Sequence, residues 1–258
     1  MKNKKFIMVN NILSFFFMFM LNALANILPI NGYYTGQLSD MYPNLFVPAG
    51  ITFSIWGLIY IALILFIGGM YKLKGVDDAK YFKLSLLFIV SNLLNGYWIL
   101  AWHYKFVFLS LIIMLALLAT LIQIFLVVKS IKVKTTSLAV KFISSATSLY
   151  LGWISVATVA NFSAFLVHVG WNRFGFSEVS WTIAIIVVVL LLTIVMLIKE
   201  KDIVFSLVVL WAYLGIVIKR LAVTPIYYEI VMVTEVAMVI IVIFVVLMFF
   251  EFNKKRVK

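Results

Sequence analysis

The sequence predicts an all-α integral membrane protein with about eight transmembrane helices. Of its 258 residues, 66% are hydrophobic and only 12% are charged, whereas soluble domains are about half apolar and a quarter charged. Apolar stretches of about 20 residues, the length that crosses a bilayer core of ~30 Å, recur about eight times. Short charged breaks separate them, and this spacing leaves no room for a soluble domain.

Each apolar stretch is predicted to form one membrane-spanning helix. The expected segments cover residues 6–28, 48–71, 84–102, 106–128, 142–169, 181–198, 203–218 and 226–250. The seventh is the shortest. Short breaks join the segments, apart from the first loop, which is long.

The basic residues predict how these segments are oriented, because cytoplasmic loops are rich in Lys and Arg. If the N-terminus is cytoplasmic, the inner side holds 17 of the 21 Lys and Arg residues. The outer side then holds only Lys105, Arg173, Lys219 and Arg220. We therefore expect a multi-pass protein of the cell membrane with both termini in the cytoplasm.

The N-terminal segment has some features of a cleaved signal peptide, namely a basic start and the small-residue triplet Ala23-Leu24-Ala25. Its apolar run is long for a signal peptide, however, and contains Asn10 and Asn11. We expect it to be retained as the first span.

Composition excludes several functions. The chain has no cysteine, so disulfides, thiol catalysis and cysteine-based metal sites are absent. The net charge of +12 follows the loop pattern rather than a nucleic-acid-binding patch, so no nucleic-acid partner is expected.

No catalytic motif or paired-histidine metal motif occurs, which argues against an enzyme without excluding one. His103 and His168 near the outer helix ends could ligate a metal, but interfacial histidines satisfied by water are the favoured interpretation.

The loop NGYYTGQLSDMYPNLF, residues 31–46, is long, aromatic and free of basic residues. Loops of this length are often functional. A ligand-covering role and a simple surface flap remain equally open.

Three predicted helices each carry a stripe of aromatic, amide or small residues on one face, since residues three or four apart share a face. The stripes are Trp56 and Tyr60; Asn95, Trp98 and Trp102, with Asn92 nearby; and Tyr150, Trp153, Ala157 and Asn161. Apolar clefts with a few convergent polar groups are typical small-molecule sites. The same residue types also suit helix-to-helix bonding and membrane-interface belts, so spacing alone leaves both interpretations open.

The last segment carries two acids, Glu229 and Glu235. Glu229 lies near the outer boundary, where Lys219 or Arg220 could pair with it. Glu235 lies about two turns deeper, at ~1.5 Å rise per residue. It is either an ion or proton site or, as we favour, a protonated acid bonded to a neighbouring helix.

The runs that carry the stripes resemble three helices of the TspO family, also called the translocator or tryptophan-rich sensory proteins. VPAGITFSIWGLIY resembles its second helix, NLLNGYWILAW its third and SLYLGWISVATVAN its fifth. The residues that match the family pattern are Pro48, Trp56, Tyr60, Asn95, Trp98, Tyr150, Trp153, Ser155, Ala157, Thr158 and Asn161. The resemblance implies a five-helix bundle over residues 1–170, with three additional transmembrane helices over residues 171–258.

The sequence departs from the family pattern at several positions. Val47-Pro48 replaces paired prolines, and Ser54 and Leu149 replace single prolines. Trp102-His103 replaces a phenylalanine pair. The chain therefore resembles a longer, divergent member.

The resemblance implies binding of a tetrapyrrole or sterol-like ligand, with no cofactor required, in a sensory or transport role. Lining residues implied by it are Trp56, Tyr60, Asn95, Trp98, Tyr150, Trp153, Ala157 and Asn161. A homodimer is implied by the resemblance alone. One alternative is a secondary transporter or ion-coupled permease with Glu235 as its intramembrane carboxyl; another is an enzyme that photo-oxidises porphyrin, as assigned to some family members.

Overall fold

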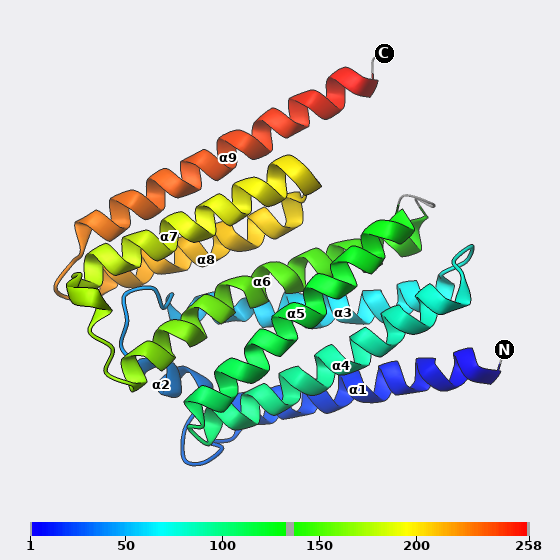
Figure 1. Cartoon of the computed structure of the whole chain (residues 1–258), viewed down its shortest axis with the longest axis horizontal. Helices are drawn as coiled ribbons and strands as arrows, with labels where there is room; N and C mark the ends of the chain where they lie inside the picture. Colours follow the sequence, from blue (N-terminus) through cyan, green and yellow to red (C-terminus); the bar gives the residue numbers. More distant parts are fainter. Residues whose placement is uncertain (1, 133–136, 257–258) are drawn as a thin grey trace. The chain divides into compact units, whose positions relative to one another are not determined.

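A computed structural model describes residues 2–132 and 137–256 (Figure 1). Over these residues it contains eight helices long and apolar enough to cross a membrane. The protein is therefore an all-α, multi-pass membrane protein, as the sequence predicts. Six of the basic residues used to predict orientation have a backbone or side chain that the structure does not describe. They are Lys2, Lys134, Lys254, Lys255, Arg256 and Lys258.

The chain forms two compact units. Unit 1 comprises residues 1–42 and 55–168, and unit 2 comprises residues 43–54 and 169–258. The first long loop is thus divided, because its second half packs with the C-terminal helices. The predicted division into domains at residues 170 and 171 stays a prediction.

Unit 1 contains five long helices and one short one. They are α1 (Lys2–Ile27), α2 (Thr35–Asp40), α3 (Ile55–Lys72), α4 (Asp78–His103), α5 (Val107–Lys132) and α6 (Leu138–His168). The long helices form a closed ring of neighbours, in the order α1, α4, α5, α6, α3 and back to α1. Figure 1 shows α1 and α4 side by side along most of their length.

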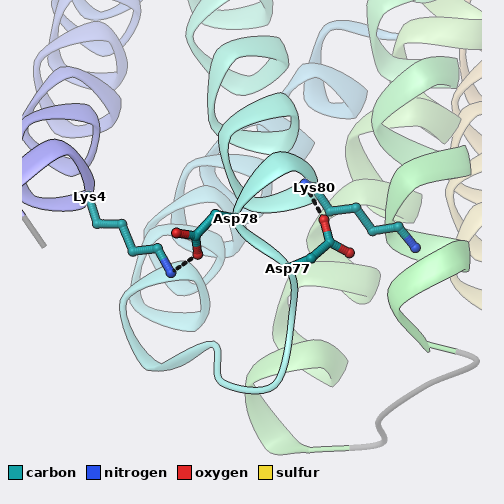
Figure 2. A network of polar contacts seen from close by, with 4 residues as sticks. All are labelled: Lys4, Asp77, Asp78 and Lys80. Carbon is teal, nitrogen blue, oxygen red and sulfur yellow. Dashed lines mark hydrogen bonds and ion pairs between the residues drawn. The ribbon is translucent and has the colours of Figure 1, made fainter.

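Polar contacts fix the beginning of α4 next to the beginning of α1. The Asp77 carboxylate caps α4 by accepting a 2.8 Å hydrogen bond from the backbone N–H of Lys80. The Lys4 ammonium of α1 pairs with Asp78, as Figure 2 shows, and lies over the Tyr81 ring. These contacts explain why α4 begins at Asp78 rather than at residue 84, where the apolar run begins.

Unit 2 contains three long helices and three short turns. They are η1 (Gly50–Ser54), η2 (Arg173–Gly175), α7 (Glu178–Val195), the π-helical turn η3 (Met196–Glu200), α8 (Ile203–Ala222) and α9 (Tyr228–Arg256). Each long helix packs against the other two, and η1 packs against α8. Side-chain caps from Ser177 and Asp202 begin α7 and α8.

The second and eighth predicted segments correspond to the candidate spans Gly50–Lys72 and Tyr228–Phe250, and each begins slightly later than predicted. The second segment, predicted from residue 48, begins as α3 only at Ile55, because residues 43–54 pack in unit 2. The eighth, predicted from residue 226, begins at Tyr228, just after Pro225. Proline restricts the residue before it and cannot donate a helical hydrogen bond.

Candidate functional site

Asn95 joins three helices of unit 1. Its side chain is fully buried on α4. Its oxygen accepts a 2.7 Å hydrogen bond from the Asn22 amide of α1, and its amide donates a 2.9 Å hydrogen bond to the Tyr150 hydroxyl of α6. Asn22 is positioned in turn by a 2.9 Å bond to the Met18 carbonyl. Because buried polar groups are costly in lipid unless bonded, this chain of three side chains specifies how the helices pack.

Aromatic rings from α3 and α6 meet next to this amide. Trp56 stacks on Tyr60, with ring centroids 5.8 Å apart. The same indole lies edge-on to Tyr150 at 6.1 Å and to Trp153 at 6.3 Å. These separations are typical of favourable aromatic pairs. Five predicted site residues therefore converge, and we call them the aromatic–amide cluster: Trp56, Tyr60, Asn95, Tyr150 and Trp153.

The cluster has a buried side and an accessible side. Asn95, Tyr150 and Trp153 are buried, whereas Trp56 and Tyr60 are half-buried. Tyr60 also meets Phe19 of α1 edge-on at 5.2 Å. The rings of α3 are therefore the more accessible part of the cluster, and Asn95, Tyr150 and Trp153 are its buried part.

Trp98 belongs to a second aromatic group. It stacks on Trp102 with centroids 6.4 Å apart, and Trp102 lies 5.6 Å from the Tyr42 ring. Tyr42 in turn meets His168 edge-on at 5.8 Å. The indole nitrogen of Trp98 is buried and has no hydrogen-bond partner among the residues that the structure describes.

Asn161 joins two helices of unit 1. It is buried and shares hydrogen bonds of 3.3 and 3.4 Å with the Ser110 hydroxyl of α5. Ser110 also donates to the Val107 carbonyl at 2.8 Å. Asn161 thus matches the helix-bonding interpretation of its stripe. Ala157 is half-buried on α6, and ligand contact by either residue stays a prediction.

Asn22 was missed by sequence reasoning because the first segment was treated only as an apolar span. A polar signal was present, since Asn11, Ser14 and Asn22 lie on one face of α1 at helical spacing. The Asn11 amide donates to the Ser85 hydroxyl at 3.2 Å, and the Asn92 amide donates to the Ser14 hydroxyl at 3.1 Å. The α1–α4 contact therefore carries buried polar pairs along much of its length.

The two histidines have different surroundings. His103 is fully buried; its Nε2 lies 3.0 Å from the Thr35 hydroxyl and its Nδ1 lies 3.3 Å from the Ile30 carbonyl. Asn31 also donates to the His103 carbonyl at 3.1 Å. The side chain of His168 is exposed. Residues 2–132 and 137–256 contain no group of three or more His, Cys, Asp or Glu residues that could hold a metal ion.

Glu235 is exposed on α9. Nothing within the described portion of the chain forms a hydrogen bond or ion pair with its carboxyl. The favoured interpretation, a protonated acid bonded to a neighbouring helix, therefore has no bonding partner among the side chains that the structure describes.

The model of a family described as TSPO-like protein matches residues 7–250, which include helices of both units. No curated protein and no solved structure matches the chain.

Proposed function

The chain belongs to the family of TSPO-like proteins, and from this premise we propose that it binds a flat hydrophobic ligand at the aromatic–amide cluster. The ligand class is a tetrapyrrole such as a porphyrin, or a sterol-like molecule. The role is sensing or transport of that ligand at the cell membrane, with both termini on the cytoplasmic side.

One observation carries the proposal: three helices of one ring bring two indoles, two phenols and an amide together. Trp56 contacts Tyr60, Tyr150 and Trp153, and Tyr150 is bonded to Asn95. Rigid aromatics with a few convergent polar groups are typical of small-molecule sites. Indole and phenol faces also stack well on flat conjugated rings.

The bonds already made limit the polar contribution of the cluster. Asn95 uses one amide hydrogen for Tyr150 and one oxygen lone pair for Asn22. One amide hydrogen remains to donate to a ligand carbonyl or carboxylate, and one oxygen lone pair remains to accept from a ligand N–H or O–H. Stacking on Trp56 and Tyr60 is therefore expected to supply most of the affinity, and Asn95 the orientation.

A porphyrin titration tests this proposal. The full chain in detergent is titrated with protoporphyrin IX, and binding is followed by the shift of porphyrin absorbance, which does not depend on the number of tryptophans. We expect saturable binding that a sterol competes with if both ligand classes share the site. The double variant Trp153→Ala with Asn95→Ala should weaken binding at least about tenfold, given ~1 kcal/mol for each lost contact.

The matched control is Trp181→Ala, which removes an indole of unit 2 that pairs with Trp171. Its porphyrin affinity should equal that of the unmodified chain. Equal affinities for the double variant and the control would contradict the proposed site. A chain that binds no porphyrin and no sterol would contradict the proposed ligand class.

The transporter alternative rests on Glu235, and its support is weaker. Ion sites in membranes need several oxygen ligands that converge, whereas Glu235 is exposed on α9. Photo-oxidation of porphyrin would be recognised by light-dependent loss of porphyrin absorbance over many turnovers in the same titration.

A further inference from the structure

Residues 43–54 connect α3, the helix that carries Trp56 and Tyr60 of the proposed site, to the rest of unit 2. The segment follows Tyr42 of unit 1 and leads directly into Ile55, the first residue of α3. Within unit 2 it is ordered by its own contacts. The Asn44 side-chain oxygen accepts hydrogen bonds of 3.2 Å from the backbone N–H groups of Phe46 and Val47, and both of these side chains are buried.

Two residues on one face of α8 hold the end of this segment. The Gly215 carbonyl accepts a 2.9 Å hydrogen bond from the backbone N–H of Ala49. The Trp211 indole N–H donates a 2.9 Å hydrogen bond to the Thr52 carbonyl. Trp211 and Gly215 are four residues apart, so one helix face provides both contacts.

The contact is too close for any side chain at position 215. A Cβ atom added to Gly215 would lie 2.0 Å from the Thr52 hydroxyl oxygen and 2.9 Å from Pro48 Cβ. Thr52 is itself fully buried, so it has little room to move away. Glycine at 215 therefore lets the backbone of η1 lie directly on α8.

We infer that α8 is a positioning element for the ligand site, and that Gly215 and Trp211 fix the point at which α3 begins. Thr52 lies four residues before Trp56, and η1 runs into α3 without an intervening loop. A shift of η1 therefore moves or rotates the first turn of α3, which carries Trp56. This assigns a role to the C-terminal helices, and its ligand part rests on the proposed function.

Cysteine labelling tests the anchor without any ligand, because the chain has no native cysteine. Two single-cysteine reporters are made at buried positions: Val47→Cys in the segment and Ile55→Cys at the start of α3. A third, Ala146→Cys, reports from a buried position on α6. Maleimide labelling rates are measured in Gly215→Ala and Trp211→Phe backgrounds, and in Gly68→Ala, an exposed α3 glycine with no atom within 4 Å of an added Cβ.

We expect Gly215→Ala to accelerate labelling at positions 47 and 55 about tenfold, and Trp211→Phe several-fold, because each loses a packing or hydrogen-bond constraint. Labelling at position 146 should not change, which separates a local shift from unfolding. Trp211→Phe keeps the inference testable should Gly215→Ala fail to fold. Porphyrin affinity should fall in parallel with labelling at position 55, and Gly68→Ala should leave both unchanged.

The outcomes are distinguishable. Labelling at positions 47 and 55 that matches the Gly68→Ala control would overturn the anchor. Faster labelling at 47 alone, with unchanged labelling at 55 and unchanged porphyrin affinity, would overturn the positioning role. A parent chain that binds no porphyrin would contradict the proposed function, while the labelling at position 55 would still decide whether α8 positions α3.

Discussion

The amide of Asn22 on α1 donates a 2.7 Å hydrogen bond to the side-chain oxygen of Asn95 on α4, and both residues are buried. Asn95 then donates to Tyr150 on α6. The Asn95 side chain thus connects α1 to the aromatic–amide cluster that is proposed to bind ligand. Damage to this amide pair should therefore affect folding and binding together.

Replacing Asn22 with alanine should destabilise the protein by about 1–2 kcal/mol, because it leaves the Asn95 oxygen buried without its donor. The free energy of unfolding in mixed micelles measures this effect. The matched control is Asn26→Ala on the same helix, since Asn26 is exposed and donates to the backbone carbonyl of Asn22. Equal destabilisation by both variants would show that the Asn22–Asn95 bond contributes nothing specific.

Adjacent glycines on α3 should respond oppositely to alanine. A Cβ at Gly69 would lie 2.9 Å from the Ala139 carbonyl oxygen and 2.8 Å from an Ile143 side-chain carbon of α6. Gly69→Ala should therefore cost about 1–3 kcal/mol of stability, because the α6 backbone cannot withdraw. Gly68→Ala meets no atom within 4 Å and should gain up to about 1 kcal/mol through helix propensity.

Thermal unfolding of both glycine variants in one detergent gives the comparison directly. A midpoint for Gly69→Ala equal to or above that of Gly68→Ala would mean that α3 and α6 do not pack as closely as the structure has them.

The membrane fold and much of the candidate site could be predicted from sequence, because apolar span length and helical spacing are local properties. Trp56 and Tyr60, or Tyr150 and Trp153, share a face wherever the helix is placed. Partners on other helices could not be predicted this way. The Asn95 bond to Asn22 and the Asn161 bond to Ser110 depend on which helices become neighbours in the ring.

The first loop was the least predictable feature, because its two halves belong to different units. Residues 31–46 were predicted as a loop and residues 48–54 as the beginning of the second span, yet residues 43–54 pack together in unit 2, where Gly215 of α8 accommodates them. A lone glycine inside an apolar span gives no indication of which segment it accommodates. The beginning of α4 was also displaced, because the Asp77 cap lies several residues before the apolar run.

His103 should hold the first half of that loop against unit 1. His103→Ala removes the contacts with Thr35 and the Ile30 carbonyl, so α2 should detach more often. A reporter at Leu38→Cys, a fully buried position on α2, should then be labelled by maleimide about tenfold faster, as expected for loss of ~1–2 kcal/mol of buried hydrogen bonding.

His168→Ala is the matched control for this experiment. His168 is the other histidine of the chain; its side chain is exposed and meets Tyr42 edge-on at 5.8 Å. It should change labelling at position 38 by less than about twofold, as surface substitutions usually do. Equal labelling rates at position 38 in His103→Ala and His168→Ala would contradict the role of His103 in holding α2.

Substitution of Glu235 separates ligand binding from ion-coupled transport. Glu235 is exposed on α9, so Glu235→Gln should leave porphyrin affinity within about twofold of the parent chain, as for surface positions away from a site. Asn95→Ala, which breaks the amide at the centre of the cluster, is the positive control and should weaken binding. Ligand flux into proteoliposomes is measured for the same two variants with and without a proton gradient. Flux that depends on the gradient and disappears only in Glu235→Gln would assign the working carboxyl to α9, because proton coupling in membranes typically uses a carboxyl or histidine and the aromatic–amide cluster contains neither.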